Sequence, residues 1–346
     1  MALNTQVLIA DTKNIDHVAK EASRLLKSGE LVAIPTETVY GLAAQIYSED
    51  AIKRIFQVKG RPQDNPLIVH ISTTDMLDEL VEDVTPDAAK LIKAFWPGPL
   101  TIIFKKKSKV SDTITCGMQT VAVRFPVHPV AQKIINKTNI PLAAPSANLS
   151  GKPSPTTAEH CFKDLNGKVP LIVDGGPCDV GVESTVISIV SDIPTILRPG
   201  IISLEEIQAV VGNARISSDV FRKVGEKEAV ASPGLKYRHY APSCPVVMIE
   251  SSSERYIEYV NKNGNSTECA MCFEEEDGMI MIPHEKYGAL NDPEEQAHNI
   301  FNLLRVLDEK GYSKIYIHAP RNEGKALAVS NRLIRAAGFQ VVSIND

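Results

Sequence analysis

Apolar residues recur at both helical and strand spacing along residues 1–212, and the two kinds of segment are interleaved. Val18, Ala22, Leu25 and Leu26, for example, fall on one face of a helix. The spacing predicts helices over residues 16–28, 48–58, 88–95, 130–137 and 203–211. It predicts strands over residues 31–34, 67–71, 101–104, 121–124, 142–144, 171–174 and 185–189. Several strands follow one another without a helix between them, so we expect a mixed sheet rather than a purely parallel one.

From residue 244 onward, short apolar runs alternate regularly with amphipathic segments. Strands are predicted over residues 246–249, 268–273, 279–282, 314–318 and 341–344, and helices over 254–261, 293–310 and 325–337. Strand and helix alternation over about 100 residues predicts a small, parallel, Rossmann-like α/β domain with three layers. It contains neither a Gly-x-Gly-x-x-Gly turn nor a P-loop, so the motifs do not support a nucleotide site there.

The segment between these two regions, residues 213–243, has a different composition. Its last part, Ser232 to Pro242, contains two tyrosines, a histidine, a lysine and an arginine within five consecutive residues. Proline and glycine argue against a regular element, whereas a plain linker is usually Gly/Ser-rich or charged. We therefore expect three parts: a domain over 1–212, a linker over 213–243 that acts as a lid, and a domain over 244–346.

The length of 346 residues agrees with two domains, and the formal net charge of −5 constrains the partners. Proteins that coat nucleic acid usually carry a basic excess, so any nucleic-acid contact of this chain must be local. The dense basic cluster Lys105, Lys106, Lys107 and Lys109 is either a solvated loop or strand end, or a patch for RNA.

Six scattered cysteines, with no secretory signal pattern before them, indicate a reducing, cytoplasmic setting. Cys269 and Cys272 form a C-x-x-C pair, but no second Cys or His pair follows at zinc spacing, so no protein-bound metal is predicted. No apolar run approaches the roughly 20 residues that span a bilayer, so no membrane association is expected.

Ile34 to Leu42 reads Ile-Pro-Thr-Glu-Thr-Val-Tyr-Gly-Leu and is the first segment with candidate chemistry. The hydroxyls of Thr36 and Thr38, with the carboxylate of Glu37, can position a small polar ligand at a strand end. Thr and Glu also favour helix starts, so a helix cap is the alternative interpretation.

The segment Lys59 to Leu67 is rich in basic and turn-forming residues and leads into the strand that ends near His70. Lys59 and Arg61 lie two residues apart on a turn, so both can face one anion. A guanidinium matches phosphate oxygens bidentately, and an ammonium acts as a point charge. The alternatives are an exposed basic loop and, for His70, a histidine of the core.

Thr120 and Arg124 flank a Val-Ala-Val strand. An arginine at a strand end can hold a ligand carboxylate, or it can form a structural ion pair. Two later turns, at residues 143–154 and 174–185, are rich in Gly, Ser and Thr, and the segment 197–200 adds one more cation, Arg198. Such turns let backbone N–H groups approach phosphates closely, although Ser and Asn are also ordinary turn formers.

These strand-end turns share hydroxyls and cations but contain neither a nucleophile triad nor a metal cluster. The inventory suits binding and aligning an anionic nucleotide and a small zwitterion, and does not suit covalent catalysis.

The motifs P-T-E-T-V-Y-G-L, K-x-R-P-x-x-N-P-L, W-P-G-P-L-T, A-P-S-A-N-x-S, G-V-E-S-T and L-R-P-G resemble those of the Sua5/YrdC/YwlC family. Their order and spacing agree with the family across about residues 15–212. The S-P-G-x-K-Y-R-H-Y-A-P segment and the C-terminal domain are similar to the long, Sua5-type members. The resemblance implies a twisted mixed sheet with a positively lined concave cavity, followed by the smaller Rossmann-like parallel domain.

The resemblance also implies an activity, that of an L-threonylcarbamoyladenylate synthase, which is a nucleotidyltransferase. L-threonine, bicarbonate and ATP would give threonylcarbamoyl-AMP, diphosphate and water, as the first step toward the threonylcarbamoyl modification of adenosine 37 in tRNA. Mg²⁺ would enter with ATP. The product would pass to a tRNA threonylcarbamoyl transferase of the TsaD type, and a weak tRNA contact is possible.

Site residues follow from the resemblance position by position. Threonine would be held by Thr38, His70, Arg124, Ala144 and Ser184. ATP would be held by Lys59, Arg61, Asn65, Thr120, Ser146, Ser154, Arg198 and the linker residue Tyr237. Lys59 and Arg61 would stabilise charge on the phosphates and so act in catalysis.

Two other functions compete with this one. The chain could be a module that binds tRNA or double-stranded RNA, which would show as a steep salt dependence of tRNA affinity. It could also transfer carbamoyl groups, as hydrogenase-maturation proteins with a related domain do. Those proteins carry further zinc-binding and acyl-phosphatase-like segments, and none is visible in this sequence.

Overall fold

The computed structural model describes residues 3–223 and 240–344, which divide into two compact units. The first unit comprises residues 3–150, 154–179 and 183–223. The second comprises residues 240–344 together with two short segments from earlier in the chain, 151–153 and 180–182. Most of the predicted lid, including Tyr237, lies outside the described residues.

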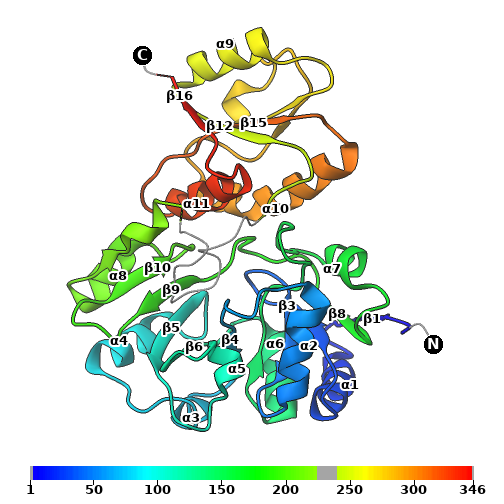
Figure 1. Cartoon of the computed structure of the whole chain (residues 1–346), viewed down its shortest axis with the longest axis vertical. Helices are drawn as coiled ribbons and strands as arrows, with labels where there is room; N and C mark the ends of the chain where they lie inside the picture. Colours follow the sequence, from blue (N-terminus) through cyan, green and yellow to red (C-terminus); the bar gives the residue numbers. More distant parts are fainter. Residues whose placement is uncertain (1–2, 224–239, 345–346) are drawn as a thin grey trace. The chain divides into compact units, whose positions relative to one another are not determined.

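Eleven strands form one sheet in the described part of the first unit (Figure 1). They are β1 (Gln6–Ile9), β2 (Val32–Ile34), β3 (Gly41–Gln45), β4 (Ile68–His70), β5 (Leu100–Lys105), β6 (Thr120–Arg124), β7 (Leu142–Ala143), β8 (Leu171–Asp174), β9 (Thr185–Ser188), β10 (Thr195–Arg198) and β11 (Arg215–Ile216). Their order is β1-β8-β2-β3-β7-β4-β6-β5-β9-β10-β11. Parallel pairs such as β4–β6 and antiparallel pairs such as β5–β6 both occur, so the predicted mixed sheet is confirmed.

Helices of the first unit cover this sheet and enclose an aliphatic core. They are α1 (Ile15–Lys27), α2 (Glu49–Lys59), α3 (Asp75–Asp78), α4 (Pro86–Phe95), α5 (Asp112–Thr115), α6 (Pro129–Thr138), α7 (Ala158–Leu165) and α8 (Leu204–Val211), with a short 3-10 turn at Ser218–Val220. Helix α1 packs on α6, and α4 packs on α8.

The residues at the two ends of helix α2 determine where Lys59 and Arg61 lie. The Ser48 side chain accepts a hydrogen bond from the Ala51 N–H and so caps the helix start. The helix ends at Gly60, whose φ of 60° is left-handed and favours glycine. Lys59 is therefore the last helical residue, and Arg61 lies in the loop that follows.

A five-stranded, wholly parallel sheet forms the centre of the second unit, with strand order β14-β13-β15-β12-β16. The strands are β12 (Val246–Glu250), β13 (Cys269–Cys272), β14 (His284–Lys286), β15 (Ile315–His318) and β16 (Val341–Ser343). The helices are α9 (Ser253–Asn263), α10 (Pro293–Lys310) and α11 (Ala326–Ala336), with a 3-10 turn at Glu274–Glu276. Helices α10 and α11 pack together, and α9 lies on the other side of the sheet (Figure 1). The predicted Rossmann-like parallel domain is confirmed.

The predicted strand over residues 279–282 is wrong. Ile280 and Ile282 are buried while Met279 and Met281 are exposed, which reproduces the alternation of a strand. The backbone there pairs instead with the Asn261 side chain, which donates to the Met279 carbonyl and accepts from the Met281 N–H. The neighbouring strand is β14, at His284–Lys286.

No helix in the described ranges is long and apolar enough to cross a membrane. Within the same ranges, the structure contains no group of three or more His, Cys, Asp or Glu side chains that could hold a metal ion.

Candidate active site

Four of the strands of the first unit end or begin beside one another and bring the predicted threonine residues together. His70 ends β4 and pairs in register with Arg124, which ends the parallel strand β6. Thr101, near the start of the antiparallel strand β5, also pairs with Arg124. Strand β9 runs parallel to β5 and begins at Thr185, so Ser184 lies at the same edge. This edge places polar side chains on a buried, otherwise aliphatic sheet.

Arg124 and Glu37 form a buried ion pair at this edge, with side chains only 5% and 4% exposed. Arg124 Nη2 lies 2.7 Å from Glu37 Oε1, and Nη1 donates to Thr38 Oγ1 over 2.7 Å. Burial opposes ionisation of Glu37, but the charge of Arg124 outweighs it and lowers the pKa of Glu37 below its usual value. The structural ion pair that the sequence left open as an alternative for Arg124 is therefore present.

The ion pair does not use all of the hydrogen-bonding capacity of its members. Arg124 Nε and Nη2 and both Glu37 oxygens are buried and make no aligned hydrogen bond with any described residue. Nη2 is close to the carboxylate but misaligned for a hydrogen bond, so the contact is electrostatic. Buried donors without acceptors are costly, and a small anionic ligand would supply the missing acceptors.

His70 is buried directly beside Arg124 and is neutral. Burial, and then the charge of Arg124, lower the pKa of His70 to about 3. Its Nδ1 lies 3.2 Å from the Ile68 carbonyl oxygen, which can only accept, so Nδ1 carries the proton. Nε2 is then left as a hydrogen-bond acceptor.

Ser184 is fixed by residues on both sides. Its Oγ lies 2.7 Å from Thr101 Oγ1, and its carbonyl accepts from Arg198 Nε and Nη2 over 3.2 and 3.0 Å. In the same turn the Ser154 hydroxyl donates to Glu183 Oε1. Arg198 is therefore a buried support of the Ser184 turn in this structure.

Ala144 directly follows strand β7 and contacts the neighbouring strand β4. Its N–H donates to the Ile68 carbonyl over 3.0 Å, and the residue is buried. The methyl side chain can therefore contribute only an apolar contact, because its backbone donor is already paired.

Lys59 is buried at the end of α2 and holds the turn that follows β7. Its Nζ donates to the carbonyls of Ser146 and Asn148, and the Ser146 hydroxyl donates to Asn148 Oδ1 over 2.6 Å. Burial, and then the charge of Arg61, lower the pKa of Lys59 well below its usual value. Lys59 Nζ also donates to Asn148 Oδ1 over 3.4 Å, so the lysine is surrounded by oxygen acceptors of this turn.

Arg61 holds its own loop closed. Its Nε donates to the Asn65 carbonyl over 3.1 Å, and Nη2 donates to the Pro66 carbonyl over 2.9 Å. Asn65 is fully buried, and its Oδ1 has no hydrogen-bond partner among the described residues. Thr120 lines a small cavity of about 10 Å³ together with Pro66, so the structure brings Thr120 beside this loop.

The structure adds Thr101, Asn148 and Glu183, to which the sequence prediction gave no role, and it gives Glu37 a protein partner instead of a ligand. Glu37 pairs with Arg124, Thr101 contacts Ser184, Asn148 pairs with Lys59, and Glu183 pairs with Ser154. All four lie inside or beside the quoted motifs, which was the available signal. Their roles depend on partners 29 to 89 residues away, which spacing alone does not show. The helix-cap interpretation of Thr36–Thr38 is wrong, because β3 follows.

The lysine cluster at residues 105–109 makes contacts within the first unit. Lys106 is buried and pairs with Asp112, and Lys109 pairs with Glu79 over 3.0 Å. Lys107 Nζ donates to the Asp78 carbonyl over 2.6 Å. These pairings reduce the positive charge available to a nucleic acid, and they favour the strand-end interpretation.

Comparison with known proteins gives matches over nearly the whole chain. Residues 24–200 match the Sua5/YciO/YrdC family model, described as telomere recombination, and residues 202–338 match the C-terminal domain of threonylcarbamoyl-AMP synthase. Threonylcarbamoyl-AMP synthases from Pyrococcus abyssi and Bacillus subtilis are each 43% identical. The first alignment covers 93% of this chain and 95% of the relative, and the second covers 93% of both.

Solved structures agree with this result. A double alanine variant of Pyrococcus abyssi Sua5 superposes with a TM-score of 0.92 at 40% identity, over 99% of both chains. The complex of Pyrococcus abyssi Sua5 with L-threonine superposes with a TM-score of 0.90 at 40% identity, over 98% of this chain and 99% of that one.

Proposed function

The chain belongs to the Sua5/YciO/YrdC family of threonylcarbamoyl-AMP synthases, in the form that carries the additional C-terminal domain, and on this premise we propose how its residues make the product. L-threonine is the amino acid substrate. ATP and bicarbonate are the proposed co-substrates, and diphosphate and water the proposed by-products. The product would then serve a tRNA threonylcarbamoyl transferase.

We place threonine at the edge formed by Thr38, His70, Arg124, Ala144 and Ser184. The observation that carries this placement is the set of buried Arg124 donors without aligned acceptors, beside a neutral histidine. The threonine carboxylate would accept from Arg124, and its hydroxyl would donate to His70 Nε2. The methyl group of Ala144 would contact the apolar part of the substrate.

We place ATP along Lys59, Arg61, Asn65, Thr120, Ser146, Ser154 and Arg198, with Tyr237 as a further contact outside the described residues. The free Asn65 Oδ1 supports this placement, because a buried amide oxygen calls for a donor. A triphosphate beside Lys59 would raise the pKa of that amine again, so nucleotide binding favours its ammonium form. Mg²⁺ would arrive bound to the phosphates of ATP.

The reaction would follow from alignment and charge stabilisation. The neutral threonine amine attacks CO2 or bicarbonate to give a carbamate, and with bicarbonate one water leaves. A carbamate oxygen then attacks the α-phosphorus of ATP, and the bond to the diphosphate breaks. Arg61 and Lys59 would stabilise the charge that develops on the phosphates, as fixed cations do in other phosphoryl transfers.

The experiment that tests the nucleotide assignment is Arg61→Ala. Loss of one preorganised donor should reduce ATP-dependent adenylate formation by about 100-fold or more. Arg24→Ala is the matched control, because Arg24 is exposed on α1 and its side chain pairs with the neighbouring Glu21 on the same helix. An Arg61→Ala protein that keeps a near wild-type rate would show that the phosphate assignment is wrong.

A further inference from the structure

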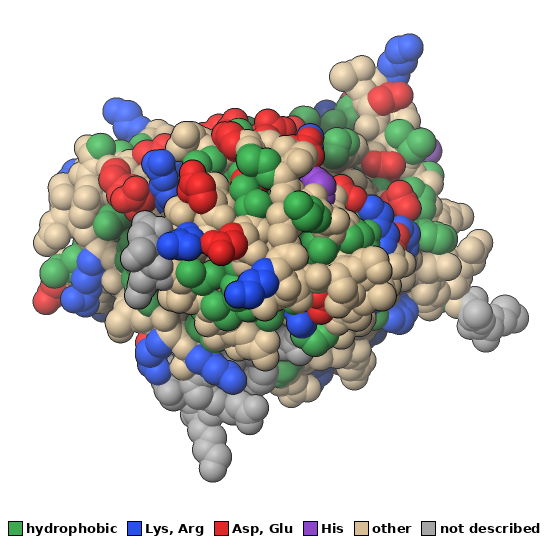
Figure 2. All heavy atoms as spheres, turned by 90° about the horizontal axis from the view of Figure 1, so that it is seen from above, with side chains coloured by type: hydrophobic (Ala, Val, Ile, Leu, Met, Phe, Trp, Pro, Cys, Tyr) green, Lys and Arg blue, Asp and Glu red, His purple; other side chains and the backbone are tan. Residues whose placement is uncertain are grey.

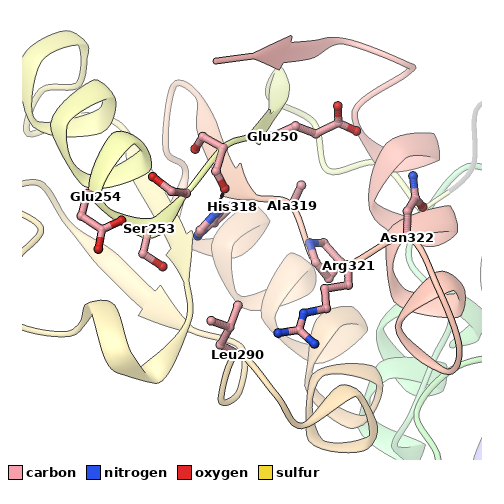
Figure 3. A pocket seen from close by; sticks show the side chains of 11 residues that line it. Glu250, Ser253, Glu254, Leu290, His318, Ala319, Arg321 and Asn322 are labelled. Carbon is pink, nitrogen blue, oxygen red and sulfur yellow. Dashed lines mark hydrogen bonds between the residues drawn. The ribbon is translucent and has the colours of Figure 1, made fainter. Parts of the chain in front are cut away.

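The second unit carries a pocket of about 700 Å³ that is lined by none of the residues assigned to threonine or ATP (Figure 3). The turn after β12, residues 250–254, forms one wall, and the turn after β15, residues 318–322, forms the other. Leu290 closes one side. The volume falls in the range of about 300–1,000 Å³ that small-molecule sites occupy.

The pocket lies where the topology of the sheet favours a ligand. Strands β12 and β15 are parallel neighbours. The chain leaves β12 toward β13 on one side and leaves β15 toward β16 on the other, so the following helices, α9 and α11, lie on opposite faces (Figure 1). The two carboxyl ends therefore separate and leave a crevice, the point at which open α/β sheets bind ligands.

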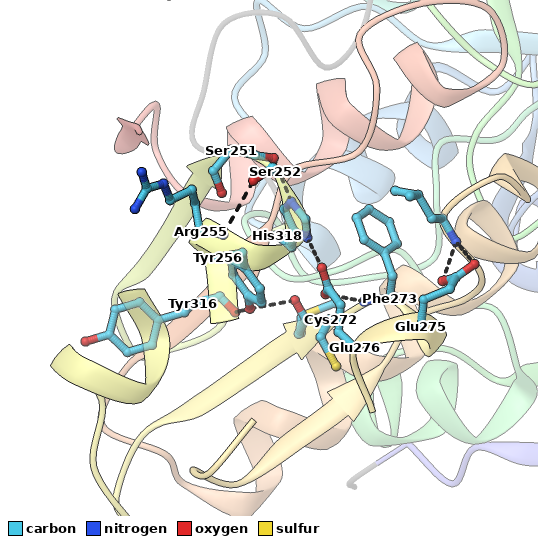
Figure 4. A network of polar contacts seen from close by, with 12 residues as sticks. Ser251, Ser252, Arg255, Tyr256, Cys272, Phe273, Glu275, Glu276, Tyr316 and His318 are labelled. Atoms are coloured by element: carbon cyan, nitrogen blue, oxygen red, sulfur yellow. Dashed lines mark hydrogen bonds and ion pairs between the residues drawn. The ribbon is translucent and has the colours of Figure 1, made fainter. Parts of the chain in front are cut away.

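A polar network surrounds His318, one of the residues that line this pocket (Figure 4). His318 Nδ1 lies 2.5 Å from Glu276 Oε1, and Nε2 lies 3.0 Å from the Ser251 carbonyl oxygen, to which it must donate. The imidazole ring also stacks on Tyr256, with ring centroids 4.5 Å apart. The network thus joins the ends of β15, β12 and β13, and it holds the Ser251 turn in place.

The mouth of the pocket offers donors for an anion. Arg321 is exposed and has no ion-pair or hydrogen-bond partner among the described residues. The N–H groups of Ser253 and Glu254 open α9, before its first backbone bond at Tyr256. Ser251 also lines the pocket, and its Oγ makes no hydrogen bond with a described residue. A guanidinium, a helix N-terminus and free hydroxyls are together a phosphate-binding set.

Two glutamates at the same pocket restrict the ligand further. Glu250 ends β12 and accepts from the Ser343 hydroxyl with one oxygen, and Glu254 is exposed at the start of α9. A bare polyanion would be repelled by these carboxylates, whereas hydroxyl groups would donate to them. We propose that this pocket binds a phosphate monoester of a polyhydroxylated compound, with the phosphate at Arg321 and the α9 N-terminus and the hydroxyls at Glu250 and Glu254.

The test titrates the full chain with ribose 5-phosphate and, separately, with inorganic phosphate, by calorimetry. Ribose 5-phosphate should bind saturably and more tightly than inorganic phosphate. Arg321→Gln should weaken both by at least about 10-fold, because it removes a charged hydrogen bond. Glu254→Gln should weaken ribose 5-phosphate alone. Both variants should make threonylcarbamoyl-AMP at the wild-type rate, which shows that they are folded.

Arg61→Ala separates this pocket from the active site and should leave ribose 5-phosphate binding unchanged. Three results would overturn the proposal. They are the absence of saturable ribose 5-phosphate binding, binding that Arg61→Ala removes and Arg321→Gln spares, and equal affinity for both probes with no effect of Glu254→Gln. Such results leave the proposed synthase reaction untouched, because it is measured separately.

Discussion

Arg124 is buried in the first unit, where it contacts Glu37 and Thr38 and keeps donors that make no aligned hydrogen bond with a described residue. A buried ion pair is a poor source of stability, because desolvation of both charges offsets their attraction. Removing one member is nevertheless costly, since the other remains charged and unpaired. Arg124 neutralises Glu37, and we propose that it has a second, separable role in binding threonine.

Arg124→Ala should lower the free energy of unfolding by about 3–5 kcal/mol, because it leaves the Glu37 carboxylate buried without a counter-charge. It should also raise the KM for threonine by about 100-fold. Glu37→Gln/Arg124→Ala should regain most of the lost stability, since no buried charge remains, but not the affinity. Urea unfolding and threonine-dependent kinetics measure the two effects.

The double variant decides between the two roles. Trp96 is the single tryptophan, is buried in the first unit, and reports on its unfolding by fluorescence. If the double variant binds threonine as tightly as the wild type, Arg124 is a structural partner of Glu37 and not a substrate ligand.

The second prediction for a single residue concerns His70 and the pH dependence of the stability of the protein. Its pKa is about 3 in the folded protein and about 6.5 in the unfolded chain. The unfolded state therefore binds one more proton between these values, so the wild type loses stability as the pH falls through this window. Between pH 7.5 and pH 5 the wild type should lose about 2 kcal/mol more than His70→Gln.

Urea titrations at the two pH values, followed by Trp96 fluorescence, give this difference. His17→Gln is the control, because His17 is exposed on α1 and should leave the wild-type pH dependence intact. If the free energy of unfolding of His70→Gln changes with pH as much as that of the wild type, His70 is not a buried neutral histidine.

For single residues, the sequence singled out candidates for the site but did not show their contacts. Arg124 was predicted as either a carboxylate ligand or an ion-pair partner, and the deciding residue, Glu37, lies 87 positions earlier in the chain. Lys59 was predicted to face phosphates, yet it donates to two carbonyls of a turn almost 90 residues away. Such pairings arise from strand order, which residue spacing does not encode.

At the scale of elements, Gly181 lies two residues before Glu183 in the chain and makes a close approach to helix α10. Gly181 has a φ of 81°, and a Cβ there would lie 2.4 Å from the His298 Cα on α10, within the second unit. Backbone cannot yield as a flexible side chain can, so any larger residue must displace the segment.

Gly212→Ala is the matched control for Gly181→Ala, because both glycines have a positive φ and only Gly181 has backbone atoms close to the added Cβ. Gly212 has a φ of 82° but no atom within 4 Å of the added Cβ, so its substitution should cost only the left-handed strain, about 1–2 kcal/mol. Gly181→Ala should cost about 1–3 kcal/mol more and raise the KM for threonine. Calorimetry and threonine kinetics measure both variants, and equal effects would contradict the account.

Strongly periodic elements were predictable and weakly periodic ones were not. Helix α10 has the bounds that its apolar spacing predicted, 293–310, and in the structure Asp292 caps its start and the left-handed Gly311 ends it. Strand β1 was missed because it is a mostly exposed edge strand with no alternation. The false strand at 279–282 alternates for a different reason, since its backbone is held by a helix side chain.

At the scale of the whole molecule, the charge of the chain argues against a protein that coats nucleic acid. The net charge is −5, and Lys106, Lys107 and Lys109 of the lysine cluster make contacts within the first unit. Acidic and basic side chains are interspersed on the face seen in Figure 2. Each unit is a separate α/β fold of the predicted class. The chemistry of the reaction is proposed for the first unit, and the phosphate-ester pocket belongs to the second.

The central claim is that this chain condenses threonine, bicarbonate and ATP. The most direct measurement is to incubate the folded protein with Mg²⁺, ATP, bicarbonate and labelled threonine, and to separate the products. Labelled threonylcarbamoyl-AMP and diphosphate should form in equal amounts, and neither product should form when bicarbonate or threonine is omitted. Folded protein that yields no labelled adenylate, or that converts ATP to ADP and phosphate instead, would contradict it.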